Sequence, residues 1–226
     1  MYDWDDILIV GDSWCSERDN LSHWPNLLLF ELTDIAKGIP RGKGFPGCSW
    51  WSTRKRLLNE LRDKPAKVII IIHTDPSRIA SDEDFPMTVN MAFRTVTVKG
   101  RWETQEKELR AKAGAEYYNH LYSANFHLWA ETKWFEELDS FLISHKDAKI
   151  IHLYGFRNQN DNHHRFNIGV TIESPLHQYL ITNTEKLKYP NHMTMEHNDK
   201  MALSLKNMIL NYPGNGFVHT KRLFEK

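Results

Sequence analysis

The chain has few cysteines, no long hydrophobic run and no excess of charge of either sign. Its only cysteines are Cys15 and Cys48, too few for the disulfide framework of a small secreted domain. We therefore expect two free thiols in a reducing compartment. No run of about 18 apolar residues occurs, so no transmembrane helix is predicted.

The charges balance. Lys+Arg and Asp+Glu each number 29 among 226 residues, which argues against nucleic acid or an anionic membrane surface as the main partner. The segment Met1–Asp6 is acidic and leads directly into an apolar stretch, unlike a secretory signal peptide. A cytoplasmic protein is expected, and the sequence leaves its oligomeric state open.

Apolar runs rich in β-branched residues alternate with helical patterns. Such runs are typical of strands buried on both faces of a parallel sheet. Strands are expected at 7–10, 68–72 and 149–156, and helices at 23–32, 48–62, 103–144 (with a break near Gly114) and 194–210. The alternation predicts an α/β fold. We expect a single domain over 1–226, with a doubly wound, flavodoxin-like, mostly parallel sheet and helices on both faces. Residues 79–115 fit this pattern poorly and are interpreted as a lid or insertion.

Polar residues follow the predicted strands where each one ends. Gly11-Asp12-Ser13 follows the first strand and His73-Thr74-Asp75 follows a later one. Because parallel strands end at the same edge of a sheet, and α/β sheets bind ligands there, these residues are expected to meet. The turn at Gly47 should lie on the same edge. Ser13 is then a candidate nucleophile, on a turn between the first strand and a helix.

A serine hydroxyl needs a base to become a good nucleophile. Among twelve histidines, His192 is favoured because it lies in a turn just before the last predicted helix, and His197 is its chief competitor. The backbone N–H of Ser13, at the start of a helix, is a candidate oxyanion donor. Gly47 is a candidate second donor, because glycine lets the backbone approach a substrate closely.

Three features together resemble the SGNH hydrolases, or GDSL-type esterases: Gly11-Asp12-Ser13 near the N-terminus, Gly47 in a small-residue turn, and the segment 191–202, whose His192 lies ten residues before Ala202. The resemblance implies that Ser13 is the nucleophile and His192 the general base. The backbone N–H groups of Ser13 and Gly47 would hold the oxyanion. The implied reaction is hydrolysis of a small or carbohydrate-linked ester through an acyl-enzyme, without a cofactor or metal.

Two positions depart from that family's pattern. The family usually has an asparagine oxyanion donor where this chain has His73-Thr74-Asp75, and here the Thr74 hydroxyl is the candidate replacement. The family also has an aspartate three residues before its histidine, a position that Tyr189 occupies. The base is then part of a Ser–His dyad, or it is oriented by an acid from elsewhere such as Asp161. Asp12 and Asp75 are candidate supporting residues.

Other interpretations stay open. A non-catalytic binding or assembly protein could use the same fold, and the two departures favour it. A metal-dependent hydrolase could use Asp161-Asn162-His163-His164, although adjacent histidines in a polar loop more often face solvent. A reactive thiol at Cys15 or Cys48 is a further alternative to two packed cysteines.

Overall fold

The computed structural model describes residues 2–16, 23–33, 41–42, 44, 47–80, 87–89, 92, 105–156, 164–172, 176 and 193–218. Its centre is a five-stranded sheet in the order β1-β2-β3-β4-β5, and every neighbouring pair is parallel. The strands are β1 (Ile7–Ser16), β2 (Val68–His73), β3 (Lys149–Tyr154), β4 (Val170–Ile172) and β5 (Gly216–Val218). The predicted α/β class with a parallel sheet is confirmed.

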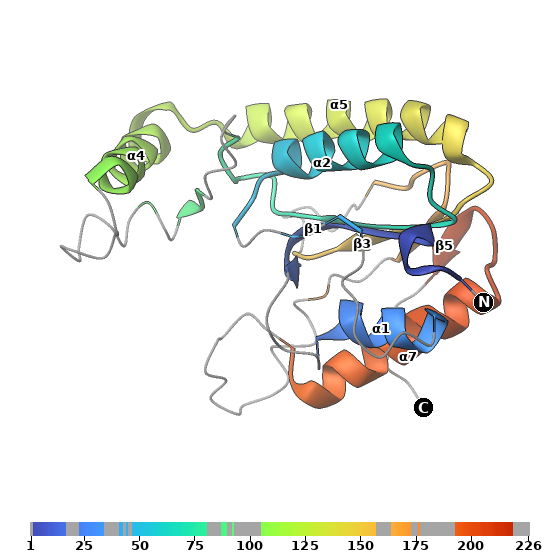
Figure 1. Ribbon diagram of the computed structural model, residues 1–226. Coiled ribbons are helices and arrows are strands. Elements are labelled where there is room, and N and C mark those ends of the chain that lie inside the picture. The colour runs from blue at the N-terminus through green and yellow to red at the C-terminus, as the bar shows by residue number, and fades with distance from the viewer. Residues whose placement is uncertain are drawn as a thin grey trace.

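Helices cover both faces of the sheet (Figure 1). On one face lie α1 (Trp24–Thr33) and α7 (Met195–Leu210), and on the other lie α2 (Trp50–Asp63) and α5 (Ala124–Leu142). The helix α4 (Gln105–Glu116) stands to one side. The short helices are η1 (Trp4–Asp6), η2 (Tyr117–Leu121) and η3 (Ile143–His145).

The strand sequences explain this layering. In β1, Ile7 and Ile9 belong to the apolar core with α1 and α7, whereas Leu8 and Val10 belong to the core with α2 and α5. The residues of β2 divide between the two cores in the same way. A strand that buries both faces needs an apolar side chain at every position, which is why these runs do not alternate with polar residues.

A short segment extends the sheet beyond β1. Ile9 N–H donates to the Arg41 carbonyl (2.8 Å), and Arg41 N–H donates to the Ile7 carbonyl (3.2 Å). The neighbouring Asp6 carbonyl instead accepts from Lys67 N–H, at the start of β2. Since alternate residues of a parallel strand direct their hydrogen bonds to opposite sides, β1 lies between β2 and the segment of Arg41. The chain therefore reverses its winding direction at β1, and such a switch point is where open α/β sheets bind ligands.

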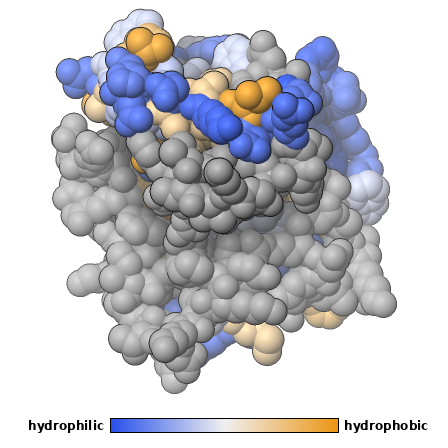
Figure 2. All heavy atoms as spheres, turned by 90° about the vertical axis from the view of Figure 1, so that its left-hand side faces the viewer, coloured by the Kyte–Doolittle hydropathy of each residue, from blue (hydrophilic) through white to orange (hydrophobic). Residues whose placement is uncertain are grey.

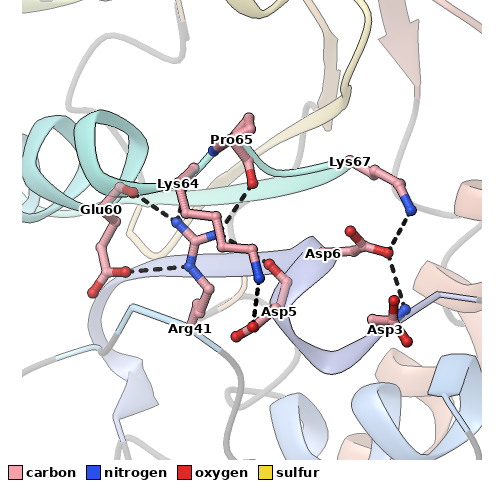
Figure 3. Close-up of polar contacts among 8 residues, drawn as sticks. All are labelled: Asp3, Asp5, Asp6, Arg41, Glu60, Lys64, Pro65 and Lys67. Atoms are coloured by element: carbon pink, nitrogen blue, oxygen red, sulfur yellow. Dashed lines mark hydrogen bonds and ion pairs between the residues drawn. The ribbon is translucent and has the colours of Figure 1, made fainter.

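The amino edge of the sheet is closed by charged contacts (Figure 3). The Arg41 guanidinium donates to the carbonyls of Glu60 (2.6 Å) and Lys64 (2.7 Å) and so caps the end of α2. Lys67 pairs with Asp6 at 2.8 Å. Burial opposes charge on Asp6, but the bonds from Lys67 and the Asp3 backbone outweigh it and lower the pKa of Asp6. These contacts hold together the edge of the sheet where the strands begin. The candidate site lies at the opposite edge, where the strands end.

The predicted helix break near Gly114 is wrong in position. Helix α4 continues through Gly114 to Glu116, η2 is a turn of π-helix, and α5 begins after Ser123, whose side chain accepts from Phe126 N–H. Gly114 packs closely against Met87, because a Cβ there would lie 2.6 Å from the Met87 sulfur unless that flexible side chain moved. The predicted lid or insertion at 79–115 includes α4, and its residues 81–86, 90–91 and 93–104 lie outside the described residues.

The side of the molecule that carries α4 is mainly hydrophilic over its described surface, with apolar side chains interspersed (Figure 2). Glu106 pairs with Arg110 and Glu108 with Lys112, both one helical turn apart on α4. Within the ranges given above, no helix is long and apolar enough to cross a membrane.

Candidate active site

Ser13 lies in a bulge at the carboxyl end of β1. The regular ladder to β2 ends at Val10, and beyond it both Gly11 and Ser16 pair with the single residue Gly44. The four residues between them therefore project from the strand. The half-buried Ser13 is one of these four, and its hydroxyl has no hydrogen-bond partner among the described residues.

Hydrogen bonds within the bulge fix its shape. Trp14 N–H donates to the Asp12 carboxylate (3.1 Å), and the Ser16 hydroxyl donates to the Ser13 carbonyl (3.1 Å). The predicted start of a helix at Ser13 is wrong, because β1 continues through Ser16 and α1 begins at Trp24. The N–H of Ser13 consequently has no helix dipole behind it, and any oxyanion role would depend on the geometry of the bulge alone.

Asp12 is the buried anchor of this region. Its carboxylate is fully buried, accepts a hydrogen bond from the Thr74 hydroxyl (2.9 Å) and pairs with Nη1 of Arg78 (2.9 Å). The Asp12 carboxylate thus has three partners: the Trp14 N–H, the Thr74 hydroxyl and the Arg78 guanidinium. A charge that solvent does not reach needs such partners. Through these contacts Asp12 ties the bulge that carries Ser13 to the turn after β2, and its side chain faces inward.

Thr74 and Asp75 follow β2 at the same edge. The single hydroxyl proton of Thr74 is given to Asp12, so an oxyanion role for Thr74 would require that bond to break. The half-buried Asp75 accepts from the backbone N–H of Ser77 at 2.8 Å and shapes the turn after β2.

The Gly47 turn is joined directly to the bulge. Gly47 has φ of 78°, a conformation that favours glycine, and it precedes the buried residues Cys48 and Ser49. The Cys48 thiol donates to the Gly11 carbonyl (3.2 Å), and Nη1 of Arg78 donates to the Cys48 carbonyl (2.9 Å). Helix α2 starts immediately afterwards, with Ser49 as its N-cap residue.

The end of β3 completes the edge. Gly155 N–H donates to the His73 carbonyl (2.8 Å), and a Cβ on Gly155 would lie 2.8 Å from the indole of Trp14. The Phe156 ring meets Trp14 edge-on at 6.1 Å, and the Arg78 guanidinium lies 4.8 Å from the centre of the same ring. The predicted convergence of the three strand ends and the Gly47 turn is confirmed.

His192, the candidate base, lies outside the described residues, which resume at Met193. The start of α7 is nevertheless tied to the bulge. The Asn198 side chain donates to the Met193 carbonyl (3.3 Å) and accepts from the Trp24 backbone N–H (3.0 Å). The Trp24 indole then donates to the Trp14 carbonyl at 2.7 Å. His197, the competing histidine, lies in the first turn of α7, with Nδ1 3.0 Å from the hydroxyl of Thr194.

The two cysteines are free and buried. Burial, followed by the nearby charge of Asp12, raises the pKa of the Cys15 thiol well above its usual value. A thiol held in its protonated form is a poor nucleophile, which argues against the alternative of a reactive thiol at Cys15.

The histidine-rich loop offers no metal site within the described residues. Asp161, Asn162 and His163 lie outside them, and His164 instead lies 3.5 Å from Asp139. No group of three or more potential ligands from His, Cys, Asp and Glu occurs in the ranges that the structure describes.

Sequence reasoning missed two residues that organise this site. Arg78 has no motif around it, and only its place after a strand end marks it. Trp24 is recognisable as the start of a helix, but its indole bond to a distant carbonyl has no sequence signal. Comparison with protein-family models, curated proteins and solved structures found no match to this chain.

Proposed function

We propose that the protein is a serine esterase of the SGNH type that hydrolyses a small or carbohydrate-linked ester. Ser13 Oγ attacks the ester carbonyl carbon while His192 accepts the hydroxyl proton. The negative oxygen of the tetrahedral intermediate is held by the backbone N–H groups of Ser13 and Gly47. His192 returns the proton to the leaving alcohol, and water then releases the acid from Ser13 by the same route in reverse.

One observation carries this proposal: hydrogen bonds made by Trp24 and Asn198 connect the bulge of Ser13 to Met193, the residue next to His192. The Trp24 indole bonds the Trp14 carbonyl, and the Trp24 backbone N–H bonds the Asn198 side chain, which in turn bonds the Met193 carbonyl. A nucleophile and base that are 179 positions apart in the sequence need such a connection to act at one place. The reaction class rests on these contacts and on the resemblance of the motifs.

The oxyanion site in this proposal is mainly backbone. Loss of one donor from an oxyanion hole costs about 10²- to 10³-fold in rate, and the chain lacks the asparagine of the resembled family. Thr74 is the candidate third donor once its bond to Asp12 is released. Asp75 carries negative charge and would take a supporting role in the turn rather than donate.

The test is hydrolysis of p-nitrophenyl acetate by the wild-type protein and by Ser13→Ala and His192→Ala. We expect each substitution to lower kcat by about 10³-fold or more, because the two residues act as one unit. Matched controls are Ser140→Ala and His120→Ala, both exposed, which should keep full activity. Undiminished turnover by Ser13→Ala would contradict the assignment.

A second candidate is a non-catalytic binding or assembly protein on the same fold. The commitment of the Thr74 proton to Asp12 favours it, because that bond removes a side-chain donor from the oxyanion site. A folded wild-type protein that a fluorophosphonate does not label at Ser13 would support this candidate. We further infer a cytoplasmic location from the two free thiols, with a small-molecule ester as the partner in place of nucleic acid or membrane.

A further inference from the structure

Arg78 contacts three separate segments of the chain at the carboxyl edge of the sheet. Its side chain is only 6% exposed, and Nη1 bonds both the Asp12 carboxylate and the Cys48 carbonyl at 2.9 Å. Its Cζ atom lies over the ring of Phe156, directly after β3, 4.8 Å from the ring centre. Arg78 itself belongs to the turn after β2.

The two bonded groups lie next to the two proposed oxyanion donors. Asp12 precedes Ser13 in the bulge, and Cys48 follows Gly47 in the turn. The bond from the Cys48 thiol to Gly11 joins the same two loops a second time. The Arg78 guanidinium is therefore placed to influence the position of Ser13 relative to Gly47.

We propose that Arg78 is a positioning residue that holds the Ser13 bulge and the Gly47 turn in register, so that their backbone N–H groups address one oxyanion. This inference rests on the proposed esterase function. Oxyanion donors work only when they lie about 2.7–3.1 Å from the developing charge, and a misplacement of about 1 Å can cost on the order of 10²-fold in rate.

The chemistry of the contact favours arginine over lysine. A guanidinium is planar and stays charged in the interior, so its Nη1 can bond a carboxylate and a carbonyl while its Cζ lies over a ring. A lysine ammonium is a compact point charge on a flexible stem and does not reproduce this set of contacts.

The experiment compares Arg78→Lys with the wild-type protein by ester hydrolysis and by amide hydrogen exchange. We expect kcat to fall about 10²-fold with KM changed less than about threefold. Exchange should become faster in the peptides that contain residues 11–16 and 47–50, and stay unchanged in β3. The matched control is Arg54→Lys, since Arg54 also pairs with a carboxylate, Glu137, and lies over a ring, that of Trp51. It should leave kcat and both loops unchanged.

A folded Arg78→Lys protein with wild-type kcat and wild-type exchange in both loops overturns the proposal. If the wild-type protein hydrolyses no ester, the proposed function fails, and the catalytic part of this inference fails with it. The exchange measurement then still decides whether Arg78 holds the two loops together. If Arg78→Lys does not fold, the double variant Asp12→Asn/Arg78→Met replaces it. This variant removes both charges of the pair, so that no single buried charge is left without a partner. It should show the same fall in kcat and the same faster exchange.

Discussion

The indole N–H of Trp24 donates to the backbone carbonyl of Trp14 at 2.7 Å, and both side chains are buried. Helix α1 is thereby attached to the residue that follows Ser13. Because the backbone of Trp24 is bonded to Asn198, this one residue couples the serine bulge to the start of α7.

Trp24→Phe tests that coupling. Phenylalanine keeps most of the ring but removes the donor and leaves the Trp14 carbonyl unpaired in the interior. We expect the free energy of unfolding to fall by about 1–3 kcal/mol, measured by urea denaturation, and kcat for ester hydrolysis to fall with it. Trp129→Phe, at a site that is 57% exposed, should change neither. Equal stability and activity in Trp24→Phe and the wild-type protein would refute the coupling.

Gly44 is predicted to tolerate no side chain. A Cβ at this position would lie 2.0 Å from the Asp12 carbonyl oxygen and 2.7 Å from the carbonyl carbon of Cys15, and backbone atoms cannot move aside cheaply. We expect Gly44→Ala to lower the free energy of unfolding by on the order of 3 kcal/mol. The control is Gly216→Ala, since a Cβ on Gly216 meets no atom within 4 Å. Thermal or urea denaturation of both variants decides the point, and equal effects would contradict the close approach.

Glu131 on α5 makes stability depend on pH. It is 4% exposed, and burial, together with the charge of Asp75, raises its pKa to about 8. Between pH 4.5 and 8 the unfolded chain has released this proton while the folded chain retains it. The group therefore favours folding at low pH, and stability is lost as the pH rises through this window.

We expect Glu131→Gln, which stays neutral, to gain on the order of 3 kcal/mol relative to the wild-type protein between pH 5 and pH 8. The measurement is urea denaturation of both proteins at the two pH values. Glu136→Gln, at an exposed position of the same helix, should show no such dependence. A difference between Glu131→Gln and wild type that stays constant with pH would show that Glu131 is ionised in the folded protein.

His152 has the opposite pH dependence. Its Nε2 lies 2.9 Å from the Ile168 carbonyl, which can only accept, so Nε2 carries the proton and Nδ1 accepts from His73 at 3.1 Å. Burial lowers the pKa of His152 to about 4. Between pH 6.5 and 4 the unfolded chain binds a proton that the folded chain does not, and stability falls as the pH falls.

His152→Gln should therefore destabilise the protein less at pH 4.5 than at pH 7, by on the order of 2–3 kcal/mol, because glutamine binds no proton in either state. Urea denaturation at the two pH values measures the difference. His120→Gln, at an exposed position, is the control. The same destabilisation by His152→Gln at both values would mean that His152 is already charged in the folded protein.

The sequence predicts those parts of the molecule that local patterns determine. The run Val68–Ile72 predicted β2, and Thr194, whose side chain accepts from His197 N–H, begins the last helix as its N-cap. That the polar residues after the strands lie at one edge could also be predicted, because parallel strands all end at the same edge of their sheet. The bulge at Ser13 could not be predicted, because it depends on Gly44 pairing with two residues of β1.

The hydrogen-bond partners of the side chains could not be predicted from the sequence either. The position of Thr74 after a strand predicts a free donor, but its hydroxyl donates to Asp12, and this bond depends on how the fold brings the two residues together. Strands β4 and β5 have three residues each, too few for a periodic pattern. Arg78 carries no motif, so its contacts with three segments could be recognised only once those segments were assembled.

The proposed esterase function requires Ser13 to be a nucleophile. The most direct measurement is intact-protein and peptide mass spectrometry after reaction with a fluorophosphonate, for the wild-type protein and for Ser13→Ala, with Ser140→Ala as the control. We expect one adduct per chain, on Ser13, present in the wild-type and Ser140→Ala proteins and absent from Ser13→Ala. An adduct on another residue, or none in folded wild-type protein, would contradict it.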